Sequence, residues 1–371
     1  MMIYMTTRIG VSSGKAGLVI ACFGAGSLLT APYVGKLSDK VGSLLVMKSS
    51  LILSGIILIL FSFIKNYYAI LAATLVWSII GEAFRPANLS LISNETEPEQ
   101  RKTAFALNRL AINLGMSIGP VIGGILSAIN FALLFYVDGI TSIIAGIFLI
   151  SMRIKPKLEI RNDSKVLTNK EEKSVNKKHQ SILKNKKFFL FLFILIPVEL
   201  VFFQFLGGLP LYLVGILEFP TSTFGLLMAI NTVLIILTEV PLNNAMANWD
   251  DRNSLALGAL LCGTGFGAMI LSNSIGFIAL TIIIWTFGEM LFFPSSASYV
   301  SVISPESRRG EYMGYYQMSF SFSIMVGPWL GAVVLENFGH VILWSGAFIF
   351  ALFSSLAFLL MKRNALKSIK N

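Results

Sequence analysis

The stretch Trp77-Ser-Ile-Ile-Gly81-Glu82 returns in this chain as Trp285-Thr-Phe-Gly288-Glu289, 207 or 208 positions later. Other matching residues are displaced by 207 to 209 positions: Pro98-Glu99 and Pro305-Glu306, Arg101 and Arg308, Gly119-Pro120 and Gly327-Pro328, Tyr4 and Tyr212, Gly17-Leu18 and Gly225-Leu226, Pro32 and Pro241. Because the displacement drifts by at most two positions over most of the 371 residues, it indicates two copies of one module.

Composition places both copies in a membrane. Hydrophobic residues make up 55% of the chain and charged residues 13%, about half the charged share of a soluble domain. Backbone that crosses lipid must form helices or a closed barrel, and strand patterning is absent, so an all-α membrane protein is expected. The apolar runs long enough to span a bilayer lie near 15–35, 44–64, 68–91, 103–127, 131–152, 188–214, 223–243, 254–272, 276–302, 312–335 and 341–361.

Duplicated apolar halves are typical of secondary transporters, whose binding site lies between the repeats. The sequence predicts an N-terminal bundle over 1–152, a linker over 153–187 and a C-terminal bundle over 188–371. The linker holds twelve Lys and Arg against four acids, which is typical of a flexible solvated connector. An alternative is an interfacial segment that binds anionic lipid headgroups.

The positive charges are distributed unevenly between the two sides of the predicted membrane protein. When loops are assigned alternately to the two sides, 24 of the 29 Lys and Arg lie on the side that carries 153–187 and the C-terminal tail. This bias predicts a plasma-membrane protein with the linker and the tail in the cytoplasm. It also accounts for the net charge of +10 without a nucleic-acid partner.

The first repeat begins late. Met1 to Arg8 match Gly208 to Ile216, so about twenty residues that would form most of a first helix have no counterpart. The expected architecture is therefore twelve helices, six in each half, of which eleven are complete here. A late start site or a truncation is the preferred explanation, and a genuine eleven-helix protein is the alternative.

No pattern of catalytic or metal-binding residues is present in the sequence. Cys22 and Cys262 have no metal-ligand spacing, His179 and His340 form no cluster, and no Gly-x4-Gly-Lys-Ser loop supports ATP-driven transport. The sequence predicts a protein that is not an enzyme and that binds no metal and no cofactor.

Between the second and third predicted helices the chain reads Gly35-Lys-Leu-Ser-Asp39-Lys40-Val-Gly42. This resembles the cytoplasmic loop signature of the major facilitator superfamily, although Ser43 and Leu44 replace the usual basic residues. The glycines allow a tight turn and a close helix approach. Asp39 can bind a helix N-terminus or a cation, and so can latch one conformation. The corresponding segment of the second half, Asn244 to Arg252, is degraded.

Gly115-Met-Ser-Ile-Gly119-Pro120-Val-Ile-Gly123-Gly124 resembles the motif of the antiporter branch of the same superfamily, with Ala106 in place of an upstream glycine. Small residues at this spacing allow a neighbouring helix to approach closely, and proline bends a helix. The whole chain looks similar to the twelve-helix drug:proton antiporters. The resemblance implies two pseudo-symmetric six-helix bundles, working as a monomer with a small-molecule substrate, membrane lipid and protons as partners.

Seven charged residues within the apolar spans are candidate site residues, because such charges are costly unless they face protein or water. Glu82 and Arg85 lie three apart on one helix face, where a structural salt bridge is the alternative to a role at the cavity. Arg109 lies eight residues beyond Arg101, roughly 12 Å along its helix. The acids are Asp138, Glu199, Glu239 and Glu289.

A carboxyl group that is removed from water can bind and release a proton near neutral pH. Glu289 resembles the membrane carboxylate that some drug antiporters use, and Glu199 is the second candidate for proton coupling. Glu239 and Asp138 are further candidates for proton coupling. Because Glu239 lies near a helix end, its side chain could instead snorkel to the membrane surface. Asp138 could instead cap its helix or form a structural pair.

The expected function is proton-coupled efflux of small amphipathic compounds by alternating access, driven by the proton gradient. One alternative is a metabolite or sugar exporter, or a proton-coupled nutrient symporter, of the same fold. Another is a non-transporting membrane sensor or scaffold.

Overall fold

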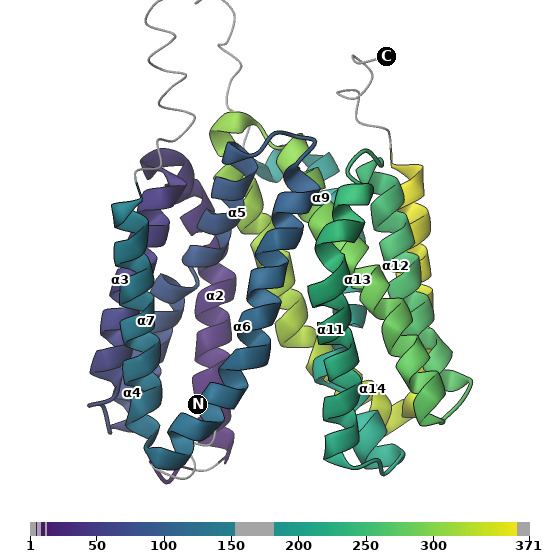
Figure 1. The fold of residues 1–371 in the computed structure, drawn as a ribbon, viewed down its shortest axis with the longest axis horizontal. Coiled ribbons are helices and arrows are strands. Elements are labelled where there is room, and N and C mark those ends of the chain that lie inside the picture. The colour runs from purple at the N-terminus through teal and green to yellow at the C-terminus, as the bar shows by residue number, and fades with distance from the viewer. Residues whose placement is uncertain (1–4, 6–8, 12, 153–181, 362–371) are drawn as a thin grey trace, which may run out of the picture. The chain divides into compact units, whose positions relative to one another are not determined.

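The structure is a computed structural model that describes residues 5, 9–11, 13–152 and 182–361, and every regular element in these ranges is helical (Figure 1). The first half contains α2 (Ser13–Val41), α3 (Ser43–Phe61), α4 (Tyr67–Gly81), α5 (Phe84–Glu95), α6 (Arg101–Ile129) and α7 (Phe131–Ser151). The second contains η1 (Ile182–Lys184), α9 (Lys186–Phe202), η2 (Phe203–Leu206), α10 (Gly208–Pro210), η3 (Leu211–Ile216), α11 (Thr221–Ala245), α12 (Asp251–Gly267), η4 (Ala268–Ile270), α13 (Ile275–Ile303), η5 (Glu306–Arg308) and α14 (Arg309–Leu360).

Each apolar run predicted from the sequence lies on helical structure, and the all-α prediction is confirmed. By length and composition, nine helical stretches among the described residues are apolar enough to cross a membrane. Three runs are not single α-helices. The run 68–91 divides at Glu82 and Ala83 into α4 and α5. The run 188–214 continues after α9 as short 3-10, α and π turns, and the run 254–272 continues after α12 as the 3-10 turn η4. The last two runs form α14, which contains a break at Gly339, where φ is 81°.

The repeat seen in the sequence is repeated in the helix boundaries. α4 begins at Tyr67 and α13 at Ile275, while α6 begins at Arg101 and α14 at Arg309, and both pairs are separated by 208 positions. The break at Gly339 lies 208 positions after Phe131, where α7 begins. The second half therefore has the helix plan of the first, with the equivalents of α6 and α7 joined in α14.

Polar side chains at the loop ends explain where several helices start. Asn66 accepts hydrogen bonds from the amides of Tyr68 and Ala69 at the start of α4. Asn130 accepts one from Ala132 at the start of α7, and Asp250 accepts one from Arg252 at the start of α12. Such caps satisfy amides that have no partner within the helix.

The chain divides into two compact units. Unit 1 consists of Met1–Glu97, Gly119–Phe189 and Ser304–Met318, and unit 2 of Pro98–Ile118, Leu190–Ile303 and Ser319–Asn371. Each unit thus includes a short segment from the other half of the sequence, and these two segments are repeat equivalents. The predicted division at 152 and 188 stays a prediction, and most of the linker and the C-terminal tail lie outside the described residues.

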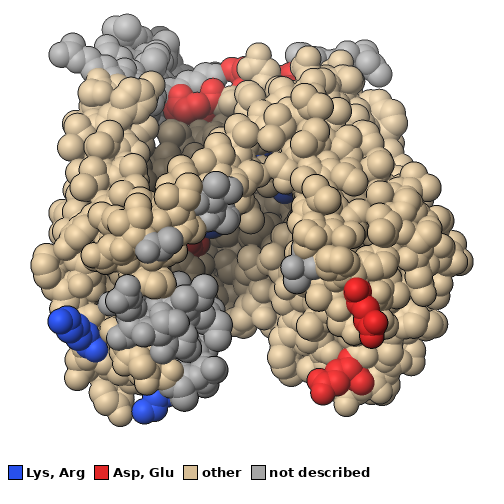
Figure 2. All heavy atoms as spheres, turned by 60° about the horizontal axis from the view of Figure 1, so that its bottom comes forward, with Lys and Arg blue, Asp and Glu red and all other residues tan. Residues whose placement is uncertain are grey.

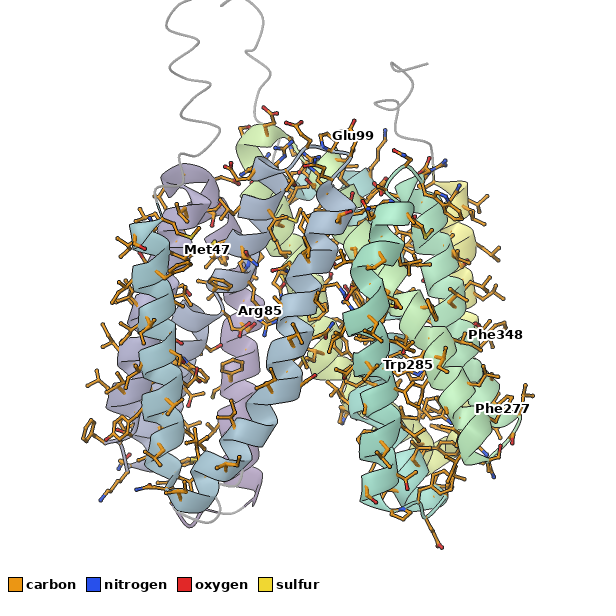
Figure 3. All side chains as sticks on the ribbon, in the orientation of Figure 1. Met47, Arg85, Glu99, Phe277, Trp285 and Phe348 are labelled. Atoms are coloured by element: carbon orange, nitrogen blue, oxygen red, sulfur yellow. The ribbon has the colours of Figure 1, made fainter. Side chains whose placement is uncertain are left out.

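Each unit has an apolar interior and an apolar surface. In unit 1, Phe61 stacks on Phe135 with ring centroids 5.2 Å apart. In unit 2, Trp285, which is labelled in Figure 3, is 1% exposed. Its ring stacks on that of Phe266, with centroids 5.2 Å apart. The face in Figure 2 is formed mainly by uncharged residues. Exposed apolar side chains such as Leu53, Ile144 and Phe353 suit contact with lipid.

Candidate functional site

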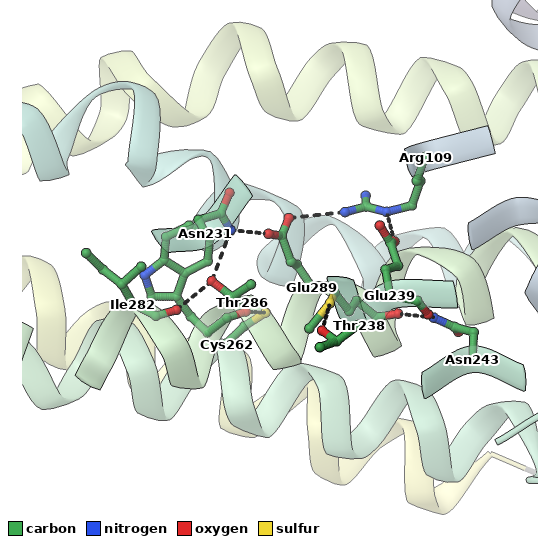
Figure 4. Close-up of polar contacts among 11 residues, drawn as sticks. Arg109, Asn231, Thr238, Glu239, Asn243, Cys262, Ile282, Thr286 and Glu289 are labelled. Carbon is green, nitrogen blue, oxygen red and sulfur yellow. Dashed lines mark hydrogen bonds and ion pairs between the residues drawn. The ribbon is translucent and has the colours of Figure 1, made fainter. Parts of the chain in front are cut away.

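Three of the candidate residues meet in unit 2, where Arg109 of α6 contacts Glu239 of α11 and Glu289 of α13 (Figure 4). Arg109 Nε donates to Glu239 Oε1 at 2.7 Å, and Nη2 donates to Glu289 Oε2 at 3.1 Å. The guanidinium carbon lies 4.6 Å from the ring centroid of Phe293. Glu239 is 0% exposed, so it does not snorkel to a helix end as one sequence interpretation expected.

The other carboxylate oxygen of Glu289 is held by a polar side chain of α11. Asn231 Nδ2 donates to Glu289 Oε1, and also to Thr286 Oγ1 at 3.0 Å. Thr286 in turn donates to the carbonyl of Ile282 at 2.6 Å. Both oxygens of Glu289 therefore have donors, which fixes the orientation of the carboxylate.

Local sequence explains why Glu289 faces this cluster. Gly288 lies against α12 so closely that a Cβ there would be 2.8 Å from the carbonyl oxygen of Gly258. Because that side of α13 is occupied by backbone, the next residue along the helix projects in a different direction. Glu289 is 2% exposed, whereas Arg109 has 17% of its side chain exposed.

The cluster has unequal numbers of positive and negative groups. When ionised, Glu239 and Glu289 carry two negative charges against the single positive charge of Arg109. A buried group of this kind retains one uncompensated charge, which is costly away from water. One proton on either carboxylate would make the cluster neutral.

Glu199 lies apart from this cluster, in α9. Its side chain is 0% exposed, and Oε2 accepts a hydrogen bond from Ser323 Oγ of α14 at 3.0 Å. Its Oε1 has no hydrogen-bond partner among the described residues. Glu199 is thus a buried carboxyl group whose known partners are uncharged hydroxyl groups.

In unit 1, Glu82 and Arg85 form an ion pair at the junction of α4 and α5, with Arg85 Nε 2.9 Å from Glu82 Oε2. Ser27 of α2 also donates to Glu82, at 3.3 Å. The Arg85 side chain is 46% exposed, so the pair is only partly shielded. Asp138 is exposed on α7, and the cap of that helix is Asn130, so Asp138 has no capping role.

The loop motif of unit 1 contacts the start of α14. Asp39 Oδ1 accepts from the amide of Gly310 at 2.6 Å, and Oδ2 accepts from the amide of Glu311 at 2.8 Å. These amides belong to the first turn of a helix, where a carboxylate is favoured. Lys40 is exposed beside Asp39. The loop of the first half therefore holds a helix of the second half.

Two glycines of the motif are required by the backbone. Gly42 has a φ of 91°, which other residues rarely adopt, and it forms the turn between α2 and α3. A Cβ at Gly35 would collide with the carbonyl oxygen of Gly310. Burial raises the pKa of Asp39 from 3.8 to about 6, while the amides of Glu311 and Gly310 oppose the shift.

In the part of the chain that the structure describes, no neighbouring element closely approaches the glycines of the antiporter motif. Among the described residues, nothing lies within 4 Å of a Cβ at Gly115, Gly119 or Gly124. A Cβ at Gly123 would meet Leu134 of α7 at an ordinary contact distance of 3.6 Å. The expected close approach of a neighbouring helix stays a prediction.

Sequence reasoning missed several polar partners. Asn231 lies in an apolar run and orients Glu289. The only signal in the sequence for this role is a polar residue within that run. Lys102 is 3% exposed and its Nζ lies 2.7 Å from the carbonyl oxygen of Trp249 and 3.0 Å from Asp251 Oδ1. These contacts join the start of α6 to the loop before α12 and to the first residue of α12.

Comparisons with known proteins agree with the fold. A profile of the Major Facilitator Superfamily matches residues 1–237 and 209–367. YqjV of Bacillus subtilis, an uncharacterised MFS-type transporter, is 26% identical over 91% of this chain and 81% of its own. A Na(+), Li(+), K(+)/H(+) antiporter of Planococcus maritimus is 23% identical over 92% of this chain and 89% of its own.

Two further similarities concern a drug-resistance protein and a solved structure. The quinolone resistance protein NorA of Staphylococcus aureus is 26% identical over 40% of this chain and 38% of its own. The crystal structure of the human organic anion transporter MFSD10 has a TM-score of 0.70 and 17% identity, covering 96% of this chain and 88% of that one. This structural likeness concerns the fold alone.

Proposed function

Because the chain belongs to the major facilitator superfamily, whose members are membrane transporters and not enzymes, we propose that it exports small amphipathic compounds in exchange for protons. The export would proceed by alternating access, in which a central site opens to one side of the membrane at a time. The proton gradient would supply the energy, without a cofactor.

The observation that carries this proposal is the Arg109–Glu239–Glu289 cluster. One proton converts the cluster from a net charge of −1 to neutral, so its protonation state changes the cost of burying it. Glu289 is the first candidate for the proton-binding group because it lies mid-helix and is held by Asn231. Glu199 is the second, because its described partners are uncharged.

Two relatives support an exchange of this kind. One is named as an antiporter with protons, and another as a quinolone resistance protein. The aromatic side chains next to the cluster also suit an apolar cargo, since Phe202 packs on Phe293 with centroids 4.8 Å apart.

The test is efflux of a fluorescent cationic dye in inverted membrane vesicles under an imposed pH gradient. Glu289→Gln should abolish gradient-driven accumulation but allow downhill exchange, because the transport pathway of the proposal remains while the titrating group is lost. Glu306→Gln is the matched control, since Glu306 has 58% of its side chain exposed. If Glu289→Gln and Glu199→Gln both accumulate dye normally, proton coupling lies elsewhere. A wild type that ignores the gradient would favour a facilitator or a sensor.

Exchange of monovalent metal cations for protons is the second candidate. It is favoured by the similarity to the Na(+), Li(+), K(+)/H(+) antiporter over most of both chains. In vesicles that contain a pH-sensitive dye, addition of Na⁺, Li⁺ or K⁺ should then collapse the pH gradient. Drug export alone predicts no such response to these ions.

The proposed setting is the plasma membrane, with a monomer whose 153–187 segment and C-terminal tail are cytoplasmic. This orientation follows from the uneven distribution of Lys and Arg. Cysteines introduced at Lys65 and Lys170 test it, because an impermeant thiol reagent should label only the first in intact cells. Labelling of the cysteine at position 170 in intact cells would contradict this orientation.

A further inference from the structure

Arg109 is the only member of its cluster that comes from the first half of the sequence. Glu239, Glu289 and Phe293 all belong to α11 and α13 of the second half. Arg109 reaches them from the segment Pro98–Ile118, which clusters with unit 2. The three second-half residues therefore surround a positive group that the second half does not itself provide.

These three residues have the chemistry of a cation-binding site. Carboxylates bind guanidinium groups through charge-assisted hydrogen bonds, and the face of an aromatic ring attracts a cation. Glu239, Glu289 and Phe293 are 0%, 2% and 3% exposed. In addition, Glu239 Oε2 is buried without a hydrogen-bond partner among the described residues, so the site has an acceptor that Arg109 does not use.

The surrounding structure holds this site in shape independently of Arg109. Asn231 holds Glu289 from α11. Asn243 donates to the backbone carbonyls of Glu239 and Met290, both at 2.9 Å, and so ties α11 to α13 next to the site. Phe293 packs edge-to-face on Phe202. A site whose residues are held in this way can keep its geometry when Arg109 leaves it.

We propose that Glu239, Glu289 and Phe293 form a binding site for a small organic cation of the guanidinium type, and that Arg109 occupies it here as an intramolecular substitute. One site holds one cation, so an external cation must displace Arg109. Displacement removes the contacts of Arg109 with α11 and α13. Binding of the cation and release of the segment Pro98–Ile118 are therefore linked.

The first repeat lacks such a site. Glu82, the equivalent of Glu289, pairs with Arg85 three positions away on the same chain segment. The positions 208 and 209 before Glu239 are Ala31 and Thr30, so the second carboxylate is absent. The inference that organic cations are substrates rests on the proposed function. Binding of a cation to this site can be measured without transport.

The test uses the purified full chain with Arg109→Ala, titrated with methylguanidinium chloride against sodium chloride at equal ionic strength. We expect a saturable rise in Tm of about 2–4 °C well above the Kd. At the same methylguanidinium concentration the wild type should show a much smaller rise, because Arg109 competes for the site. Loss of one carboxylate, in Arg109→Ala with Glu289→Gln or with Glu239→Gln, should weaken binding about tenfold or more. Arg85→Ala is the matched control and should not respond.

A second measurement does not depend on the folding of Arg109→Ala. In the wild type, methylguanidinium must displace Arg109, so competition requires a concentration well above the Kd measured with Arg109→Ala. Hydrogen exchange over 98–118 should then rise, and sodium should have no such effect.

The site is overturned if Arg109→Ala shows no Tm rise, if sodium reproduces the rise, or if the rise persists without Glu289. It is also overturned if methylguanidinium leaves exchange over 98–118 of the wild type unchanged. Failure of binding with intact proton-driven efflux rejects this site alone. Intact binding without proton-driven efflux rejects the proposed function alone.

Discussion

Glu82 and Glu289 occupy equivalent positions in the two repeats, but the arginines that pair with them are not equivalent. Glu82 pairs with Arg85, three residues later, across the junction of α4 and α5. Glu289 pairs with Arg109, which lies 180 residues earlier in the chain. The first pair is local, so it can persist when other helices move. The second depends on α6 lying against α13, so a conformational change can break it.

Asp39→Asn should slow transport by about tenfold while substrate affinity stays nearly unchanged. Asp39 accepts two backbone amides at the start of α14, whereas an asparagine offers one acceptor oxygen and places an NH2 group at the other position. The loss of one such hydrogen bond costs about 1–3 kcal/mol. Transport rate and equilibrium binding are measured in parallel, with the exposed Lys36→Gln as control. A large loss of binding with normal exchange between conformations would contradict a latch.

The contact of Asp39 with α14 should weaken as the pH rises. Burial raises the pKa of Asp39 to about 6, against 3.8 for an exposed group. The buried arrangement therefore binds a proton more tightly than the released one. Its extra stability is complete below about pH 4 and is lost as the pH rises through about 6. Hydrogen exchange at the amides of Gly310 and Glu311, corrected for intrinsic rates, should increase over this interval. Asp39→Asn should remove the dependence, and a flat wild-type profile would refute it.

Gly35→Ala should open the same contact by steric collision. The added Cβ meets the carbonyl oxygen of Gly310, which is backbone and cannot move aside as a side chain would. We expect faster exchange at Gly310 and a loss of transport. Gly115→Ala is the matched control, because open space surrounds a Cβ there. If Gly115→Ala stops transport while the protein stays folded, the antiporter motif acts in another conformation, where its helix has a close neighbour.

The sequence predicted the positions of helices much better than the partners of charged residues. Apolar runs located the long described helices, because hydropathy depends on residues that are neighbours in the sequence. The break at Glu82 was not predicted from the sequence. Proline does not explain it, because Pro294, the repeat equivalent of Pro86, lies within the continuous helix α13. Arg109 was expected to need a partner, but Glu239 and Glu289 are 130 and 180 residues away, and only the side-chain contacts in the structure identify them.

Lys102→Met should release the start of α6 in unit 2. Lys102 is buried, and it contacts the carbonyl oxygen of Trp249, Ser254 Oγ at 3.2 Å and Asp251 Oδ1. Methionine keeps the apolar stem but has no donor, so these acceptors lose a charged partner. Removing one member of a buried ion pair costs about 3–5 kcal/mol, and somewhat less here because Asp251 has 12% of its side chain exposed.

Hydrogen exchange over 98–118 should therefore rise in Lys102→Met, and gradient-driven efflux should fall. Lys65→Met is the matched control, since Lys65 is exposed in the loop between α3 and α4. Arg109→Ala combined with Lys102→Met should raise exchange further than either substitution alone, because the two side chains hold the same segment by separate contacts. If Lys102→Met leaves exchange unchanged while Arg109→Ala increases it, the carboxylate cluster alone holds α6 in this unit.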